Sequence, residues 1–253
     1  MKIVYMCQDT VTGMYSALYD AWVESRDQEV GIEFRGQIEH QLFCEYREVT
    51  ESERKAIAIE RLIQKHLGYH TYWDIYHTLL AKDSDKVEAV FKVMQEAREL
   101  SNSQKIMEHL SSPNVTRVFE CSRKVANEAH LFTGFVRFKQ LKNGVLFSEI
   151  KPKNQVLTCI ADYFTDRFPL ENWMIYDKTH QTFLVHHKKQ HWFLLTGHDV
   201  DSEAIQALVE AEDDWERLWQ GFCTSISIKE RENRSLQRGN LPLRFRENMV
   251  EFS

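Results

Sequence analysis

The chain has 253 residues, of which 43% are hydrophobic and 28% charged, so it is long enough for one large domain or two smaller ones with a proper core. Its apolar N-terminal run is too short for a signal peptide, and it has no stretch of about 18 apolar residues. We therefore expect a soluble, cytoplasmic protein without a membrane span. The five cysteines form no CxxC pair, which argues against a disulfide framework and a structural zinc site.

Glycine and histidine patterns speak against several common enzyme classes. The nine glycines form neither a GxGxxG nor a GxxxxGK[ST] loop, and no GxSxG is present. His186 and His187 belong to a histidine cluster, but neighbours on a strand point to opposite faces and cannot share one metal ion. We expect no cofactor and no bound metal, and we leave open whether the protein is an enzyme, with a non-catalytic role favoured.

The net charge is −6, but the charges are unevenly distributed. Residues 1–110 carry 13 basic and 19 acidic residues, whereas residues 111–253 carry 19 of each. Within the second part, residues 199–216 hold eight acids and no Lys or Arg, and residues 229–246 hold six basic residues and two acids. Two interpretations stay open: the basic segment binds a partner, or it pairs with the acidic segment of the same chain.

Periodicity predicts a strand and several helices in the first part of the chain. The expected elements are a strand at residues 2–7, a helix at 14–26, extended chain over 30–48, and helices around 72–80 and from 84 onward. Gly31 and Gly36 mark turns in the extended part. Thr50 and Glu53 form a capping box that opens a further helix, and Gly68 ends it.

The second part gives clearer signals. Ser112 and Pro113 are typical of a helix start, and an apolar stripe from Val115 to Ala129, with Ala126 in it, predicts that this helix packs on a core. Asn143-Gly144 predicts a hairpin turn. The further expected elements are hairpin strands at 132–141 and 144–150, a helix at 153–168, strands at 173–177, 182–186 and 192–196, and a helix at 202–222.

Helices and strands alternate without a regular βαβ repeat. We therefore predict an α+β fold, in which an antiparallel sheet is flanked by several helices and no Rossmann or P-loop unit is present. The expected organisation is an N-terminal strand–helix region at residues 1–83 packed on a core domain at residues 84–253, unless residues 1–253 form one continuous domain.

Four residues are weak candidates for catalysis. Glu128 and His130 suggest acid–base chemistry, but residues two apart on a helix diverge, and a structural or phosphate-contacting His130 is the alternative. Asp177, at the end of a predicted strand, and His180 are the other two groups that the pocket of such an enzyme would contain.

A series of motifs carries a resemblance. In order, they are NEAHLFTGFVRF (127–138), Pro152, YFTDRF (163–168), WMIYD (173–177), LWQGFCTSISI (218–228), Arg231 with Asn233, and LPLRFRENMVEF (241–252). Their order and spacing resemble an uncharacterised bacterial family of proteins assigned to DNA metabolism or DNA repair. The resemblance covers the chain well from about residue 84 to its end.

The resemblance implies a DNA repair context without assigning a reaction. Members of that family look like partners of a radical S-adenosylmethionine protein assigned to DNA repair, and the same domain is found fused to uracil-DNA glycosylase-like domains. The resemblance thus implies two partners for the chain: this radical S-adenosylmethionine protein, and DNA that is single-stranded or damaged. The resemblance identifies no catalytic residues in this sequence.

The leading hypothesis is an accessory or adaptor protein that binds nucleic acid. Cations beside aromatic residues suit a nucleic-acid surface, as do arginines in a polar tail. The candidate nucleic-acid-binding residues are Arg137, Lys139, Arg167, Arg231, Arg234, Arg238 and Arg244. Phe135, Arg137 and Lys139 are expected on one face of a strand. The alternatives are an enzyme acting on a modified nucleotide or nucleic acid, and a protein–protein scaffold that uses the acidic 199–216 segment.

Overall fold

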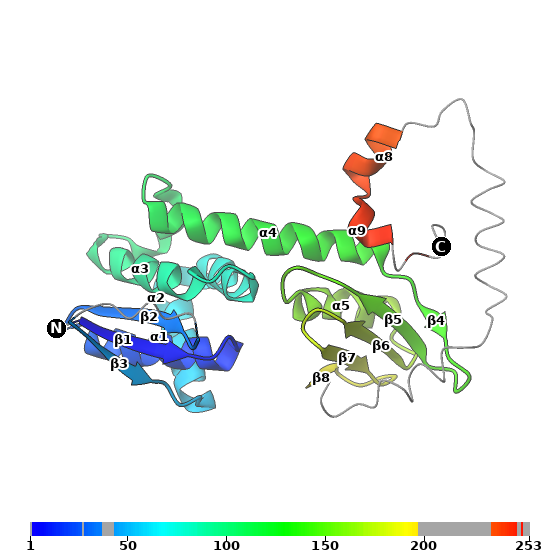
Figure 1. Cartoon of the computed structure of the whole chain (residues 1–253), viewed down its shortest axis with the longest axis horizontal. Coiled ribbons are helices and arrows are strands. Elements are labelled where there is room, and N and C mark those ends of the chain that lie inside the picture. The colour runs from blue at the N-terminus through cyan, green and yellow to red at the C-terminus, as the bar shows by residue number, and fades with distance from the viewer. Residues whose placement is uncertain (1, 27, 37–42, 197–233, 247–248, 250–253) are drawn as a thin grey trace. The chain divides into compact units, whose positions relative to one another are not determined.

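A computed structural model describes residues 2–26, 28–36, 43–196, 234–246 and 249 of the chain (Figure 1). The chain divides into two compact units, the N-terminal unit Met1–Ala126 and the C-terminal unit Asn127–Ser253. The predicted helix at residues 202–222 lies outside the described residues. No helix in the described part of the chain is both long and apolar enough to span a bilayer.

The N-terminal unit is built on a three-stranded parallel sheet. Strands β1 (Lys2–Cys7), β2 (Val30–Phe34) and β3 (Cys44–Glu48) pair in the order β2-β1-β3. Helix α1 (Val11–Glu24) follows β1 and returns the chain to the edge at which β2 starts, which makes β1 and β2 parallel. The predicted strand and first helix are confirmed, whereas Gly31 lies within β2 and not in a turn.

Three further helices complete this unit with the start of a fourth. They are α2 (Glu53–Leu80), α3 (Lys86–Glu99), the 3-10 helix η1 (Ser103–Glu108) and α4 (Pro113–Phe135). Helix α2 is broken at Gly68, whose φ of +84° belongs to the region that glycine favours. The predicted capping box is wrong: Ser52 is the N-cap residue, and its backbone amide donates to the Ser16 hydroxyl at 2.9 Å.

The core of the N-terminal unit joins the sheet to all of these helices. Its fully buried side chains include Ile3, Leu18, Ile63 and Phe91, which come from β1, α1, α2 and α3. Val118 of α4 is also fully buried, as the apolar stripe predicted, but Ala126 of the same predicted stripe is exposed.

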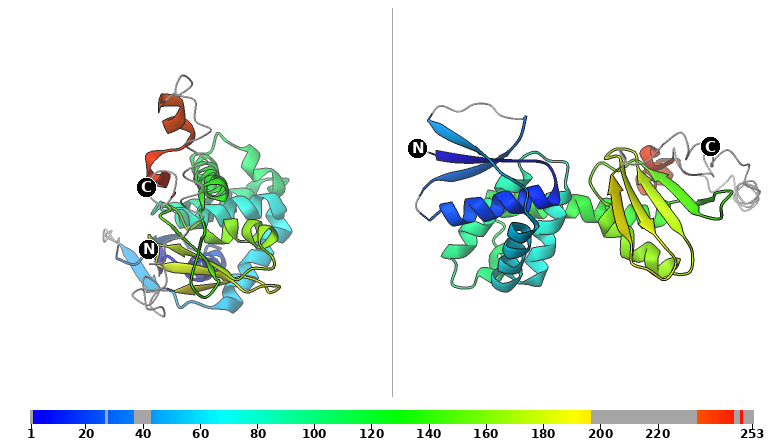
Figure 2. Two further views of the ribbon diagram at one scale, coloured as in Figure 1. Left: turned by 90° about the vertical axis from the view of Figure 1, so that its right-hand side faces the viewer. Right: turned by 90° about the horizontal axis from the view of Figure 1, so that it is seen from below.

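The C-terminal unit contains a five-stranded mixed sheet with the order β4-β5-β6-β7-β8 (Figures 1 and 2). The strands are β4 (Lys139–Gln140), β5 (Leu146–Ile150), β6 (Trp173–Asp177), β7 (Thr182–His186) and β8 (Phe193–Thr196). Strands β5 and β6 are parallel and joined by helix α5 (Leu157–Arg167), while the other three pairs are antiparallel. Two short helices follow later in the chain, α8 (Arg234–Asn240) and α9 (Leu243–Arg246).

The predicted antiparallel sheet is therefore wrong. The sheet of the N-terminal unit is entirely parallel, and that of the C-terminal unit is mixed, although the chain does combine helices and strands. The physical reason is the same for the pair β1–β2 and for the pair β5–β6. A helix between two strands carries the chain back to its starting edge, so the next strand runs parallel to the first.

The predicted hairpin is present but shorter than expected. Its turn contains Gly144 at φ +81°, and β4 pairs antiparallel with β5. Residues 132–135 belong to α4 and not to a strand, because Phe132 continues the buried stripe of that helix one turn after Ala129. The expected strand face of Phe135, Arg137 and Lys139 therefore does not exist.

The two faces of the mixed sheet differ. Trp173, Ile175 and Asp177 alternate along β6 and are all fully buried, and their register partners on β7 include the buried His186. The opposite face carries a smaller cluster around Phe147 and Phe183. Alternation thus places the Asp177 carboxyl group on the well-buried face, at the end of β6.

Candidate nucleic-acid interface

The parallel pair β5–β6 brings two loops together. Ile150, the last residue of β5, pairs with Asp177, the last residue of β6, and the Lys178 amide donates to the Ile150 carbonyl oxygen at 2.9 Å. The segments after these strands, residues 151–154 and 178–180, therefore lie at the same edge of the sheet. We call these residues the carboxyl edge. In open α/β sheets, ligands bind preferentially beyond the carboxyl ends of parallel strands.

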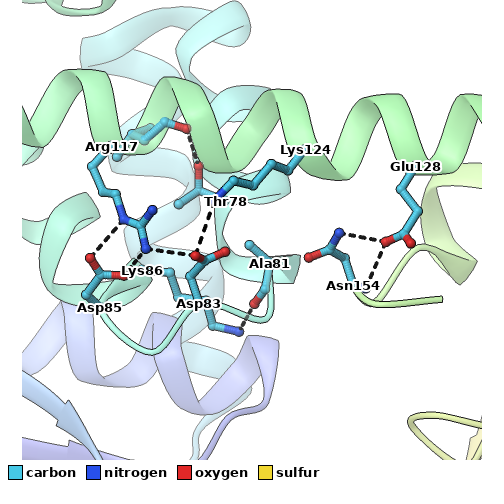
Figure 3. A network of polar contacts seen from close by, with 10 residues as sticks. Thr78, Ala81, Asp83, Asp85, Lys86, Arg117, Lys124, Glu128 and Asn154 are labelled. Carbon is cyan, nitrogen blue, oxygen red and sulfur yellow. Dashed lines mark hydrogen bonds and ion pairs between the residues drawn. The ribbon is translucent and has the colours of Figure 1, made fainter. Parts of the chain in front are cut away.

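Glu128 of α4 holds the first of these loops (Figure 3). Its side chain is 3% exposed, and its Oε2 accepts from the Asn154 amide at 2.9 Å and from Asn154 Nδ2 at 2.6 Å. Its Oε1 accepts from the Lys153 amide at 3.0 Å and forms an ion pair with Arg244 Nη1 at 2.7 Å. A carboxylate has about four acceptor sites, so Glu128 is saturated with donors.

This arrangement changes the role expected for Glu128. A buried acid that is occupied by four donors anchors its neighbours, and it has no acceptor left for an incoming substrate. The anchored groups are the loop after β5 and helix α9, through Arg244. His130 is two residues further along α4 and exposed, so the structure does not bring it together with Glu128.

Asp177 and His180 meet at the carboxyl edge. Asp177 is 1% exposed, and its Oδ1 accepts from the amides of Thr179 and His180 at 2.9 and 3.1 Å. Its Oδ2 lies 2.6 Å from His180 Nδ1, and the His180 side chain is 24% exposed. The Asp177 carboxylate stabilises the turn between β6 and β7 and orients the imidazole of His180. Since Asp177 contacts Nδ1, Nε2 is the ring nitrogen of His180 that remains for other contacts.

The exposed groups at this edge are mainly cationic. Lys151 and Lys153 are exposed on either side of the buried Pro152, and Lys178 pairs with Glu149 at 2.6 Å. The described residues of the C-terminal unit contain 13 Lys and Arg against six Asp and Glu, although the whole chain is acidic. Positive charge of this kind favours a polyanionic partner.

The other predicted cations that the structure describes lie on different elements. Arg137 Nη1 donates to the Gly134 carbonyl oxygen at 2.8 Å, so this side chain caps the end of α4. Lys139 is exposed on β4, and Arg238 is exposed on α8, which Arg234 opens. Arg231 lies outside the described residues.

Arg167 lies at the opposite edge of the sheet from Arg244. It is the last residue of α5, and Pro169 nearby accepts a hydrogen bond from the Lys189 amide, which follows β7. Since β7 runs antiparallel to β6, the residues after β7 lie at the edge where β6 begins. The predicted arginines are thus divided between the two edges.

The aromatic residues expected beside the cations pack inside the unit. Phe135 lies 5.1 Å from Phe245 between ring centroids, and Phe138 lies 5.5 Å from Phe164. They stabilise the contact of α9 with α4 and the face of the sheet covered by α5.

The described residues give little support for a function that uses a reactive thiol or a bound metal ion. Burial raises the pKa of the Cys159 thiol, in the first turn of α5, to about 11, so it is protonated at neutral pH. No group of three or more His, Cys, Asp and Glu side chains suited to a metal ion occurs in the described parts of the chain. His186 is buried and stacked on Trp173, while His187 is exposed.

Sequence reasoning missed the lysines of the carboxyl edge. Lys151 and Lys153 flank a proline between a predicted strand and a predicted helix. If the parallel crossover from β5 to β6 had been recognised, these lysines, which follow the end of a strand, would have indicated a binding site at the carboxyl edge.

Fold and site together define a two-unit α/β protein whose C-terminal unit presents a cationic edge. The chain belongs to the family described as Domain of unknown function (DUF4130), whose family model matches residues 84–251. This agrees with the expectation of an uncharacterised family. No curated protein matches the chain.

Proposed function

We propose that this protein is a nucleic-acid-binding accessory protein of DNA repair or DNA metabolism, and that it acts with a radical S-adenosylmethionine partner. The observation that supports binding is the carboxyl edge, where Lys151 and Lys153 are exposed on a loop held by the buried Glu128. The repair context rests on the motif resemblance in the second part of the chain.

The geometry suits contact with phosphate groups. A loop anchored through its own amides presents its lysines with little loss of conformational freedom on binding. Arg244 adds a planar guanidinium group at the same loop, where it is tied to Glu128 and 35% exposed. Phosphate contacts of this kind give affinity without sequence preference, which fits an adaptor.

The test is binding of labelled single-stranded DNA by fluorescence anisotropy at several salt concentrations. We expect Lys151→Ala/Lys153→Ala to weaken binding and to flatten its salt dependence by about one unit of slope per lost phosphate contact. The matched control is Lys142→Ala/Lys188→Ala, which removes the same charge from exposed positions at the opposite edge of the sheet. Equal effects of the two double variants, or no binding by the parent chain, would contradict the proposal.

The proposed partner is tested separately. Tagged chain purified from native extract should retain an iron–sulfur protein of the radical S-adenosylmethionine class, detectable by its absorbance and by mass spectrometry. Retention that disappears after nuclease treatment would indicate that DNA, and not direct contact, joins the two proteins.

A second candidate is an enzyme acting on a modified nucleotide or nucleic acid. The observation that favours it is the 2.6 Å contact between Asp177 Oδ2 and His180 Nδ1, which resembles the pairing of a general base with its orienting carboxylate. Turnover of nucleic-acid substrates that is lost in His180→Ala and kept in the exposed control His191→Ala would support the enzyme. Absence of turnover by the parent chain would exclude it for the substrates tested.

A further inference from the structure

The N-terminal unit contains a cavity of about 370 Å³ that the nucleic-acid interface does not use. It opens between the end of α1, the first half of α2, the end of α3 and the start of η1. This volume lies at the lower end of the roughly 300–1,000 Å³ typical of small-molecule sites. The apolar part of its lining consists of Leu62, Leu67, Met94, Ala97 and Leu100.

Two arginines, Arg26 and Arg98, line the same cavity. The Arg98 guanidinium carbon lies 3.7 Å from the ring centroid of Trp22, which is a close cation–π contact. Both arginines are largely exposed, but partial desolvation, and then the neighbouring charge of Arg26, lower the pKa of Arg98. The described lining contains no carboxylate, and neither arginine forms an ion pair with another described residue.

Helix ends explain part of this arrangement. Arg26 follows the C-terminus of α1 and Arg98 is in the last turn of α3, where positive charge is favourable. That effect accounts for one charge at each helix end. It does not account for two mutually repelling guanidinium groups beside an apolar cavity of ligand size.

We propose that this cavity binds a small anion that carries an apolar ring, with the ring against Leu62, Leu67 and Met94 and a phosphate or carboxylate group bound by Arg26 and Arg98. An anion between the two guanidinium groups removes their repulsion and accepts their paired donors. A ring in the apolar lining adds burial of nonpolar surface. The site is in the other unit and independent of the proposed nucleic-acid interface.

The test is titration of the full chain, labelled at its methyl groups, with three probes: phenyl phosphate, benzoate and inorganic phosphate. We expect saturable NMR shifts at the methyl groups of Leu62, Leu67 and Met94 with at least one ring-bearing probe. Inorganic phosphate should bind about tenfold more weakly, because it leaves the apolar lining empty. Comparison of the two ring-bearing probes distinguishes a phosphate from a carboxylate ligand.

Variants test the two arginines. Arg26→Gln/Arg98→Gln should weaken binding of the ring-bearing probe by about tenfold or more. Arg98→Lys, which keeps the charge and loses the planar fork, should weaken it less. The control Arg54→Gln/Arg61→Gln removes the same charge from exposed positions of α2 that do not line the cavity, and should bind as the parent does.

Several outcomes would overturn the proposal. They are no saturable shift at millimolar probe, shifts confined to residues outside the cavity, undiminished binding by a folded Arg26→Gln/Arg98→Gln variant, and equal affinity for inorganic phosphate. Thermal unfolding of each variant checks that it is folded.

Discussion

The two units of this protein build their interiors in different ways. In the described part of the N-terminal unit, the buried polar side chains are hydroxyl groups and a single charge, that of Lys86, which reaches the Ala81 carbonyl oxygen and Asp9 at 2.6 Å each. The described part of the C-terminal unit buries two carboxylates, Glu128 and Asp177, together with Asn154 and His186.

Because of this difference, the interiors of the two units have different roles. Apolar burial stabilises in proportion to area and has no directional requirement, whereas a buried carboxylate is stable only with its own set of donors. In the C-terminal unit, these donors belong to the loops of the carboxyl edge, apart from Arg244 of α9. The same interactions that hold this unit together therefore also position its candidate binding residues.

The largest loss of stability is expected when the polar interior of the C-terminal unit is disrupted. Glu128→Ala removes the acceptor of two amides, Asn154 Nδ2 and Arg244, and should cost about 3–5 kcal/mol, the range for breaking a buried charge pair. Hydrogen exchange measured peptide by peptide should show lost protection in the loop after β5 and in α9. The control Glu120→Ala, at an exposed position of the same helix, should change stability by less than about 0.5 kcal/mol.

A smaller effect is expected in the apolar interior of the N-terminal unit. Val118→Ala removes two fully buried methyl groups and should cost about 1–3 kcal/mol, by loss of transfer free energy and creation of a cavity. Thermal or denaturant unfolding measures it. Val23→Ala makes the same change at a position that is 56% exposed, and should have little effect. A cost for Val118→Ala as small as that of Val23→Ala would show that the stripe of α4 is not core.

A partly exposed charge network of the N-terminal unit should contribute less to stability, and its contribution should depend on pH (Figure 3). Arg117 pairs with Asp83 at 2.8 Å and with Asp85 at 2.6 Å, so Arg117→Ala should cost about 0.5–2 kcal/mol at neutral pH. Denaturant unfolding of both proteins across a pH series measures this cost.

The pH dependence of that cost follows from the two aspartates. Burial opposes ionisation of Asp83, but hydrogen bonds from Arg117 and Lys124 outweigh it and lower its pKa. The hydrogen bond from Arg117 also lowers the pKa of Asp85. Since both pKa values lie below 3.8, the contribution is complete above that pH and is lost as the pH falls through the lowered values. A stability difference between parent and variant that grows below this pH would contradict the assignment.

The smallest expected effect concerns His130. Because this side chain is exposed, His130→Ala should change stability by less than about 0.5 kcal/mol and leave DNA affinity unchanged. His180→Ala, which removes the imidazole held by Asp177 at the carboxyl edge, is the comparison for DNA affinity. A large effect of His130→Ala in the binding assay would place the nucleic-acid interface on α4 and not at the carboxyl edge.

Local patterns predicted the elements of this protein well where one face is clearly apolar. The alternating apolar residues of 173–177 and 182–186 are strands β6 and β7 as predicted, and Ser112-Pro113 does open α4. The same patterns misplaced the end of α4, because residues 132–138 are apolar enough to satisfy both helical and alternating periods.

The sequence alone determined where most of the helices and strands form, because helix caps, turn glycines and the periodicity of apolar residues act over a few neighbouring residues. Only the tertiary structure decided strand direction and the composition of the candidate site. Asp177 and Ile150 pair because α5 makes β5 and β6 parallel, and Glu128 meets Arg244 across a long stretch of sequence. Contacts of this kind depend on how elements pack, and no local pattern encodes which distant partner a buried carboxylate acquires.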